Sequence, residues 1–388
     1  MKKLILPALA ISTLSASAAG DAPLPIDQWT YIQIDNKKAM WGDFAKPNWL
    51  RYFGLDMGDI DQDGDADIIT GRNVYLNPGD DMSSQWRKLD LGKNVDAMLF
   101  YQENDQSPPR LIAEALPDVW EFEYKKGSFK SRVIGQIPAT GHHNGQGYRV
   151  ADITGNGTNE ILLASLGGIF MLELGPDGMT TSKAIGKDAS DEGFAVGDID
   201  GDGDLDLASG FRVEGKDPEN PLVVVWFENP GSSSENWTKH EVGLTTHAVD
   251  RVEIGDLNGD GKADIAVAEE RYPGLEPDAS LWVFLQGEKR WDRKKIVTQY
   301  SMNNLDTADM DNDGDLDLIT CEHKGSKLEL QIWENDGSAN FTKTLVDQGK
   351  ESHLGAQTAD MDGDGDLDIV SIGWDQHKFV HLWRNDAK

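Results

Sequence analysis

The sequence predicts an all-β protein, a seven-bladed β-propeller closed into a ring by its N-terminal strand. Three observations lead to this fold class: an acidic nine-residue motif that recurs along the chain, short apolar runs that flank every copy, and a strand count that is one short at the C-terminal end. Each copy lies between two runs of strand-forming residues, so strand, turn and strand make one repeated hairpin. A closed eight-bladed ring and an open array are the lesser alternatives.

The repeated motif reads D-x-[DN]-x-D-G-x-x-D and occurs five times, at residues 59–67, 198–206, 256–264, 309–317 and 360–368. Carboxylates crowded into nine residues repel one another unless a cation lies among them. The glycine at position six permits a sharp turn, which brings oxygens of positions one, three, five and nine and the carbonyl of position seven together. Oxygen ligands in a flexible loop favour calcium over magnesium, and no Cys/His cluster indicates zinc.

The expected ligands follow directly from these positions. They are Asp59, Asp61, Asp63, Asp65 and Asp67; Asp198, Asp200, Asp202, Asp204 and Asp206; Asp256, Asn258, Asp260, Lys262 and Asp264; Asp309, Asp311, Asp313, Asp315 and Asp317; and Asp360, Asp362, Asp364, Asp366 and Asp368. At position seven, where Lys262 stands in the third of these loops, the ligand is the main-chain carbonyl. We expect about five Ca²⁺ ions; a solvated acidic turn repeated by chance is the alternative.

The spacing of the loops gives the number of repeats. Most copies begin about fifty residues apart, which is typical of propeller blades, but the interval from 59 to 198 is too long. Two degenerate copies fill it. Residues 152–160 keep Asp152 and Glu160 but have Thr154 and Asn156 in ligand positions, which predicts at most a weak sixth site. Residues 102–110 have lost nearly every anionic ligand and are expected to bind no calcium.

The strand count closes the ring. A third strand follows each hairpin and often ends in an aromatic residue and a turn. A fourth strand comes after it in every repeat but the last, where the sequence stops at Lys388 after the third strand. The missing fourth strand stands at residues 28–35, QWTYIQID, before the first loop. We therefore expect the N-terminal segment to complete the last blade and remove its exposed edge.

With these motifs the chain resembles the FG-GAP/VCBS repeat family, the calcium-loop propellers that include the integrin α-subunit head and many secreted bacterial proteins. The resemblance extends over essentially the whole mature chain and rests on the five complete loops. It implies the propeller fold and bound calcium. The scaffold carries adhesins, binding modules, and carbohydrate-active lyases and dehydratases, so function has to be argued from the loops.

Composition and the N-terminus indicate where the protein works. Residues 1–19 have the basic start, apolar stretch and small-residue cleavage site of a secretory signal peptide, which leaves 20–388 as a single propeller domain. We expect a secreted or periplasmic protein without a membrane anchor. The formal charge is −32 without a basic stripe, which argues against nucleic acid. Cys321, the single cysteine, is expected to be a small core residue.

Antiparallel strands sort the remaining polar residues onto two faces. The calcium loops and the turns between third and fourth strands share one face, and the other loops and the links between blades share the opposite face. The residues on the opposite face include His142, His143, His247, His323, His353 and His377 with Trp41, Trp49, Arg271, Tyr272 and Trp374. A polar stripe along the innermost strands, comprising Asp56, Arg149, Glu253, Asp306 and Gln357, is expected to face the central channel.

Two functions fit this arrangement. The first is a glycan-active protein, whose substrate or partner is a polysaccharide or oligosaccharide. As a lyase, it would neutralise a uronate with Arg271, remove a proton with His143 or His353, and protonate the leaving oxygen with Tyr272 or a second histidine, His142 or His247. A hydrolase would instead need two carboxylates, with Glu269, Glu270, Asp250 and Asp191 as candidates.

The second function is a non-catalytic adhesion or recognition module that binds protein or carbohydrate on the same face. Adhesins usually carry a further domain, a stalk or a wall anchor, and none is recognised in this sequence, which favours the first function. Calcium as a catalytic Lewis acid is disfavoured, because the loops are expected to saturate the ion on the far face.

Overall fold

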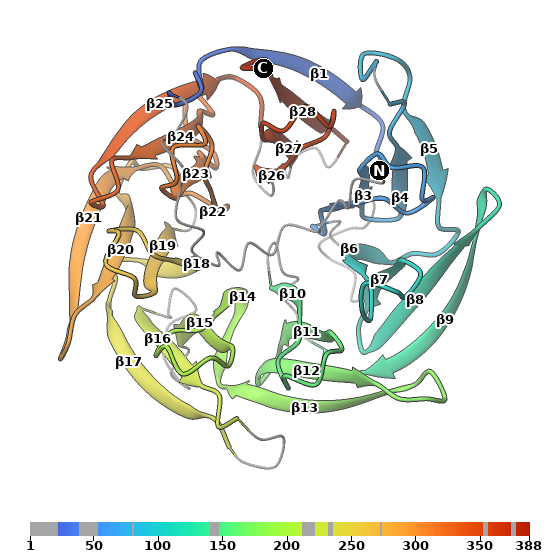
Figure 1. Ribbon diagram of the computed structural model, residues 1–388, viewed down its shortest axis with the longest axis horizontal. Helices are drawn as coiled ribbons and strands as arrows, with labels where there is room; N and C mark the ends of the chain where they lie inside the picture. Colours follow the sequence, from blue (N-terminus) through green and yellow to red (C-terminus); the bar gives the residue numbers. More distant parts are fainter. Residues whose placement is uncertain are drawn as a thin grey trace.

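The described residues form a ring of seven antiparallel sheets. The computed structural model describes residues 22–38, 53–79, 81–139, 147–211, 222–231, 236–271, 274–351, 356–373 and 378–388, and the expected signal peptide lies outside them. Seven four-stranded sheets radiate from a common centre as blades (Figure 1). The predicted all-β, seven-bladed propeller is therefore confirmed. Across these stretches, no helix has the length and apolar character that crossing a bilayer requires.

The blades follow the chain in order, each from its innermost to its outermost strand. Blade one contains β2 (Asp56–Gly58), β3 (Asp67–Thr70), β4 (Asn73–Leu76) and β5 (Arg87–Asp90); blade two contains β6 (Asp96–Tyr101), β7 (Arg110–Ala115), β8 (Asp118–Lys125) and β9 (Ser128–Gln136); blade three contains β10 (Tyr148–Ala151), β11 (Glu160–Ser165), β12 (Gly168–Leu174) and β13 (Thr180–Lys187). Blade four contains β14 (Ala189–Gly197), β15 (Asp206–Phe211), β16 (Val223–Glu228) and β17 (Thr238–Leu244); blade five contains β18 (Ala248–Gly255), β19 (Asp264–Glu270), β20 (Ala279–Gln286) and β21 (Trp291–Gln299); blade six contains β22 (Asp306–Ala308), β23 (Asp317–Cys321), β24 (Leu330–Asn335) and β25 (Phe341–Asp347).

Blade seven joins the two ends of the chain. It contains β26 (Gln357–Ala359), β27 (Asp368–Ile372), β28 (Val380–Asn385) and, as its outermost strand, β1 (Trp29–Asp35). Figure 1 shows β1, in blue, lying outside the red β28 near the C-terminus. The register runs from Trp29 opposite Asn385 to Asp35 opposite Val380. The prediction that the N-terminal strand completes the last blade is confirmed.

The segment after β1 connects blades seven and one by hydrogen bonds. The Lys38 N–H donates to the Lys378 carbonyl at 2.8 Å, and the Asn73 side-chain amide donates to the Lys38 carbonyl at 2.9 Å. The ammonium of Lys38 is buried and donates to Thr70 Oγ1 at 3.3 Å. Ring closure therefore uses side chains as well as the strand ladder.

The hydrophobic core lies between neighbouring blades. Between blades one and two, for example, Ile69 and Val74 pack with Phe100 and Leu111. At Gly58 a Cβ atom would lie 2.4 Å from the Phe100 ring, so a glycine is required for the two innermost strands to approach. Because each sheet is buried on both faces by its neighbours, the inner strands are nearly continuous apolar runs.

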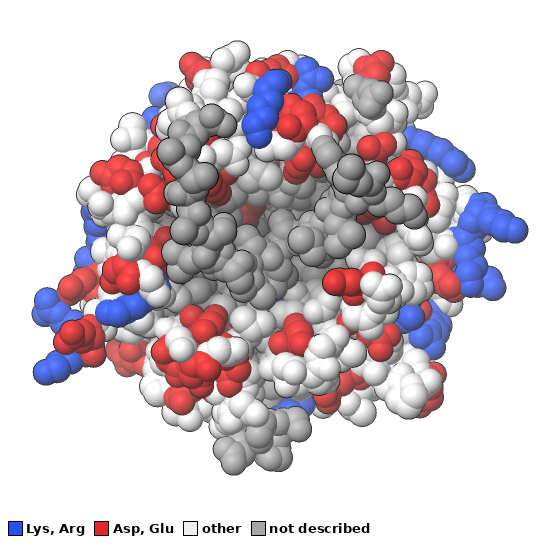
Figure 2. All heavy atoms as spheres, in the orientation of Figure 1, with Lys and Arg blue, Asp and Glu red and all other residues white. Residues whose placement is uncertain are grey.

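The outermost strands face solvent and carry positively charged side chains. Exposed lysines on them are Lys88, Lys130, Lys187, Lys239, Lys295 and Lys343. Charged side chains on an edge strand oppose pairing with another molecule. Figure 2 shows Lys and Arg gathered mainly at the margin of the ring, whereas acidic groups form separate clusters around the visible face.

Candidate metal loops and the opposite face

Each acidic loop is a turn between two paired strands. In the complete copies the residue before the loop pairs with position nine, as Gly255 pairs with Asp264. The backbone takes positive φ at position six, with values of 108° at Gly64 and 101° at Gly314, and nothing lies within 4 Å of a Cβ built at either glycine. Conformation rather than space therefore requires glycine there. Position four is also left-handed, which suits Asn312.

Carboxylate oxygens of positions one, three and nine converge in four of the loops. In each group the three oxygens lie within 4.8 Å of one another: Asp59, Asp61 and Asp67; Asp198, Asp200 and Asp206; Asp309, Asp311 and Asp317; Asp360, Asp362 and Asp368. Calcium binds oxygen at 2.3–2.6 Å, which holds opposite ligands about 4.6–5.2 Å apart. The four triads therefore have the donor type and spacing to bind a calcium ion.

Position five was expected in the same shell, but it belongs to none of these triads. Asp63 Oδ1 accepts the N–H of Asp65 at 3.2 Å, and Asp313 Oδ1 accepts that of Asp315 at 2.9 Å. One oxygen of the position-five carboxylate thus stabilises the turn itself.

Position nine is the buried end of each site. In blade one, Asp67 Oδ2 accepts the Ile60 N–H at 3.1 Å and Oδ1 accepts the Asn77 N–H at 2.8 Å. Burial, reinforced by the neighbouring carboxylates, raises the position-nine pKa to about 8 for Asp67 and Asp368, about 7 for Asp206 and Asp317, and about 6 for Asp264. A carboxylate whose charge is disfavoured by burial and by like charges is stabilised by a bound cation.

Three further oxygens support the same interpretation. Within the described residues, Asp61 Oδ1, Asp204 Oδ1 and Asp366 Oδ1 are buried and accept no hydrogen bond. All three belong to acidic loops, and buried polar atoms in native proteins are rarely left without a partner. A calcium ion in these loops would supply that partner and crosslink the two strands of each hairpin.

The loop of blade five differs from the other four complete copies. It keeps Asp256 and Asp264, but position three is Asn258, whose Oδ1 accepts the Asp260 N–H at 2.9 Å. An amide oxygen is also a calcium ligand, although it carries no charge. This fifth site remains a prediction.

The degenerate loops hold their turns by hydrogen bonds of their own. In blade three, the Thr154 hydroxyl donates to Glu160 Oε1 at 3.0 Å and the Ile153 N–H donates to Glu160 Oε2 at 2.8 Å. In blade two, Arg110 at position nine forms an ion pair with Glu121 at 3.4 Å. A threonine hydroxyl, a longer glutamate carboxylate and an arginine here occupy positions that aspartate or asparagine fills in the complete loops.

On the opposite face, only part of the predicted catalytic set is described. His142, His143, Tyr272 and His353 lie outside the described residues. Arg271 and His247 are described, and Asp278 brings them together. Arg271 forms an ion pair with Asp278, and His247 Nε2 lies 3.9 Å from Asp278 Oδ2. The guanidinium that was expected to neutralise a uronate thus already has a carboxylate partner.

Glu269, a candidate for hydrolysis, has a structural role. Its Oε1 accepts N–H groups from Thr246 at 2.5 Å, His247 at 3.0 Å and the Trp282 indole at 2.7 Å. Its Oε2 accepts the Ser280 N–H at 2.7 Å, and the side chain is fully buried. The carboxylate joins the link before β18 to the start of β20, so it fixes the backbone beside His247.

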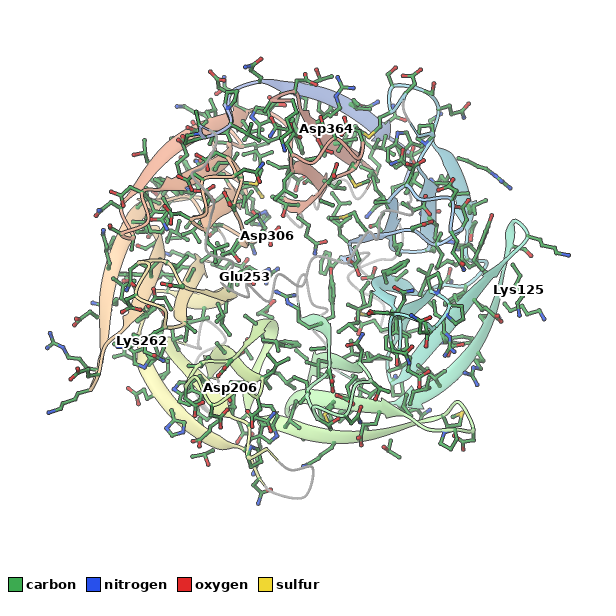
Figure 3. The ribbon with its side chains drawn as sticks, in the orientation of Figure 1. Lys125, Asp206, Glu253, Lys262, Asp306 and Asp364 are labelled. Atoms are coloured by element: carbon green, nitrogen blue, oxygen red, sulfur yellow. The ribbon has the colours of Figure 1, made fainter. Side chains whose placement is uncertain are left out.

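Sequence reasoning missed a buried arginine near the channel. Arg251 on β18 lies 3.1 Å from Asp250 and 3.8 Å from Glu192, and Gly193 leaves room for its side chain. The signal in the sequence is the Asp250–Arg251 pair in an inner strand that also carries Glu253. Nearer the metal loops, Arg149 forms an ion pair with Glu253 at 2.6 Å. Figure 3 shows Glu253 and Asp306 at the inner margin of the ring.

The acidic hairpins also match a known repeat. A family model described as an FG-GAP-like repeat matches residues 198–267 and 309–371, which cover the complete loops of blades four to seven. This chain contains FG-GAP-like repeats. The T-cell immunomodulatory protein of Rattus norvegicus is 28% identical over 201 residues, which are 49% of this chain and 31% of that protein. The aligned part of this chain therefore spans about a third of the length of this curated relative.

Several solved structures share the fold of these FG-GAP-like repeats. A lectin from Agrocybe aegerita that recognises non-reducing terminal N-acetylglucosamine superposes with a TM-score of 0.55 at 16% identity, covering 92% of this chain and 95% of the lectin. BBS1N, in complex with ARL6DN, gives 0.55 at 11% identity, covering 92% and 98%. At these identities the likeness concerns the fold.

Proposed function

We propose that this protein is an exported, calcium-stabilised propeller that binds carbohydrate through the face opposite its metal loops. The observation that carries the proposal is the difference between the two faces. One face is committed to acidic loops. The other presents large apolar side chains in blades three to five: Leu166 is 64% exposed, Leu275 66% and Leu244 52%. Sugar rings have apolar faces and polar edges, so they bind where apolar surface adjoins fixed polar groups.

The polar groups of this face are held in place. The Arg271 guanidinium is oriented by Asp278, and the main-chain N–H of Arg271 donates to Ser301 Oγ at 2.8 Å. The His247 N–H is fixed by Glu269. Groups whose orientation is set before binding lose little entropy when a ligand arrives. Arg271 and the exposed Leu275 both follow β19 in blade five, and His247 immediately precedes β18 of the same blade.

Two further considerations support carbohydrate as the ligand class. The Agrocybe aegerita lectin, which recognises terminal N-acetylglucosamine, shares the propeller over nearly the whole chain. The expected signal peptide at residues 1–19 would export the protein to a compartment that is rich in calcium and in extracellular glycans. Export is part of the proposal.

Binding without turnover is favoured over chemistry at the described residues. Arg271 is already paired with Asp278, and Glu269 is occupied by four N–H donors. A lyase mechanism would rest on His143 and His353, which lie outside the described residues.

The test is a glycan array probed with the mature, calcium-loaded protein and two matched variants. Leu275→Asp places a charge on the proposed face and should weaken binding about tenfold or more, the equivalent of ~1.4 kcal/mol. Met179→Asp places the same charge on the metal-loop face, where Met179 is 45% exposed, and should leave affinity unchanged. Equal effects of the two variants would contradict the proposed face. Absence of binding to any glycan would favour the protein-recognition alternative.

A polysaccharide that binds is then incubated with the protein, and new reducing ends and ultraviolet absorbance are followed. The proposal predicts neither signal. Reducing ends alone would indicate a hydrolase, and reducing ends with absorbance a lyase.

A further inference from the structure

One side chain in blade six contacts the acidic loops of two blades. The Asn335 N–H donates to Asp317 Oδ1 at 2.8 Å, so it holds the position-nine carboxylate of its own blade. Its side-chain amide donates to the Leu316 carbonyl at 3.1 Å and, across the blade boundary, to the Leu257 carbonyl at 2.9 Å. Leu257 is the second residue of the blade-five loop. Asn335 is itself buried.

The connection continues to the blade-five site. The Leu257 N–H donates to Asp264 Oδ2 at 3.1 Å, and Asp264 is the position-nine carboxylate of that loop. A series of hydrogen bonds thus connects Asp317 to Asp264 through Asn335 and the main-chain groups on either side of Leu257. The two buried carboxylates at its ends are therefore positioned by common groups.

The same connection recurs between blades five and four. The Gln286 N–H donates to Asp264 Oδ1 at 2.7 Å, and its side-chain amide donates to the Ile199 carbonyl at 2.7 Å. The Ile199 N–H donates to Asp206 Oδ2 at 2.9 Å. Asp264 therefore accepts one N–H from each of two inter-blade connections.

The path goes on to blade three. The Asn229 N–H donates to Asp206 Oδ1 at 2.8 Å, its amide donates to the Ile153 carbonyl at 3.0 Å, and the Ile153 N–H donates to Glu160 at 2.8 Å. One path thus links the loops of blades three, four, five and six.

Between blades six and seven the path is interrupted. The Asn385 N–H donates to Asp368 Oδ1 at 2.8 Å, as in the other blades. Its side-chain amide, however, has no hydrogen-bond partner among the described residues, although Asn385 is only 1% exposed. The blade-seven loop is therefore not joined to the blade-six loop through this amide.

We propose that the metal loops of blades four, five and six bind calcium cooperatively through the side-chain amides of Gln286 and Asn335, whereas the loops of blades six and seven bind independently. An ion that orders the blade-six loop fixes Asp317 and with it Asn335, and Asn335 then holds Leu257 against Asp264. Gln286 and Asn335 act as positioning residues, because they orient ligands without touching an ion. Coupling of two sites by such groups changes affinity reciprocally.

Hydrogen–deuterium exchange read by mass spectrometry tests this loop by loop in the full chain. Asp309→Asn combined with Asp311→Asn removes the blade-six site. The calcium concentration that half-protects residues 256–264 should then rise about 2- to 12-fold, the effect of one net hydrogen bond. Residues 360–368 should be unaffected. Equal shifts in both loops, or none in 256–264, would overturn the proposal.

A second variant keeps every carboxylate, so it tests the same proposal if the first variant does not fold. Asn335→Ala alone should raise the half-protecting calcium concentration in 256–264 and 309–317 and leave 360–368 unchanged. The control is Asn340→Ala, which removes an exposed contact between the same two blades, the 2.8 Å hydrogen bond from Lys294, without touching an acidic loop. Identical behaviour of the alanine variant and its control would overturn the proposal.

Discussion

Substitution of Glu269 tests whether a buried carboxylate beside the proposed binding face has a structural role or a chemical one. Four N–H groups, from Thr246, His247, Ser280 and the Trp282 indole, donate to its two oxygens in a fully buried site. Glu269→Gln replaces one acceptor oxygen by an NH₂ group, so at least one N–H group loses its acceptor and faces another donor. Glu269→Ala removes the acceptor from all four.

The size of the effect follows from the number of donors. A buried donor left without an acceptor costs about 1–3 kcal/mol. We therefore expect Glu269→Gln to lower the free energy of unfolding by about 1–3 kcal/mol and Glu269→Ala by about 4 kcal/mol or more. A cooperative unit of this size has an unfolding entropy near 0.8 kcal/mol/K, so 4 kcal/mol corresponds to a melting temperature about 5 °C lower.

The assay is thermal unfolding by circular dichroism in saturating calcium. Glu276→Gln is the matched control, because Glu276 is exposed on the same face of the same blade. If Glu269→Gln has the same melting temperature as Glu276→Gln but has lost carbohydrate binding or turnover, Glu269 is a functional carboxylate and the structural assignment is wrong.

Three other predictions test the metal loops and the ring. In chelator, the melting temperature should fall as pH rises from about 5 to 8. Burial raises the pKa of Asp67 to about 8 and of Asp317 to about 7, above the ordinary 3.8, so the folded state holds protons that the unfolded chain has released. Saturating calcium should flatten this pH dependence, and a melting temperature that rises with pH in chelator would contradict the prediction. Thr154→Asp with Glu160→Asp rebuilds an acidic triad with Asp152 and should add one calcium ion per chain by native mass spectrometry, whereas an unchanged count would show that the loop geometry does not bind an ion. Deleting residues 22–38 exposes the edge of β28 and should cause self-association in light scattering, because an unpaired strand edge pairs readily; a stable monomer would contradict the closure argument.

The sequence is sufficient for the architecture because the repeat period, the strand count and the acidic turns are all local patterns. The misplaced fourth strand at residues 28–35 predicts the closure that the β1–β28 pairing confirms. The metal triads could be predicted for the same reason, since positions one, three and nine come from one hairpin.

The opposite face was less predictable, because its side chains are arranged by partners from other strands and by the backbone. Nothing in the local sequence pairs Arg271 with Asp278 or gives Glu269 four N–H donors, three of which are main-chain groups. Arg251 was missed because β18 already carries Asp250 and Glu253, and no periodic pattern marks a further charged residue on an inner strand as buried. Its two carboxylate neighbours come from β14 and from its own strand.

The claim that acidic hairpins hold this propeller together through bound cations is tested most directly by a calcium count on the mature protein, made by equilibrium dialysis against millimolar calcium. We expect at least four ions per chain from the four carboxylate triads, and a fifth if the Asn258 loop binds one. We also expect chelation to lower the melting temperature by many degrees. A protein that holds no calcium and melts unchanged in chelator would contradict the claim.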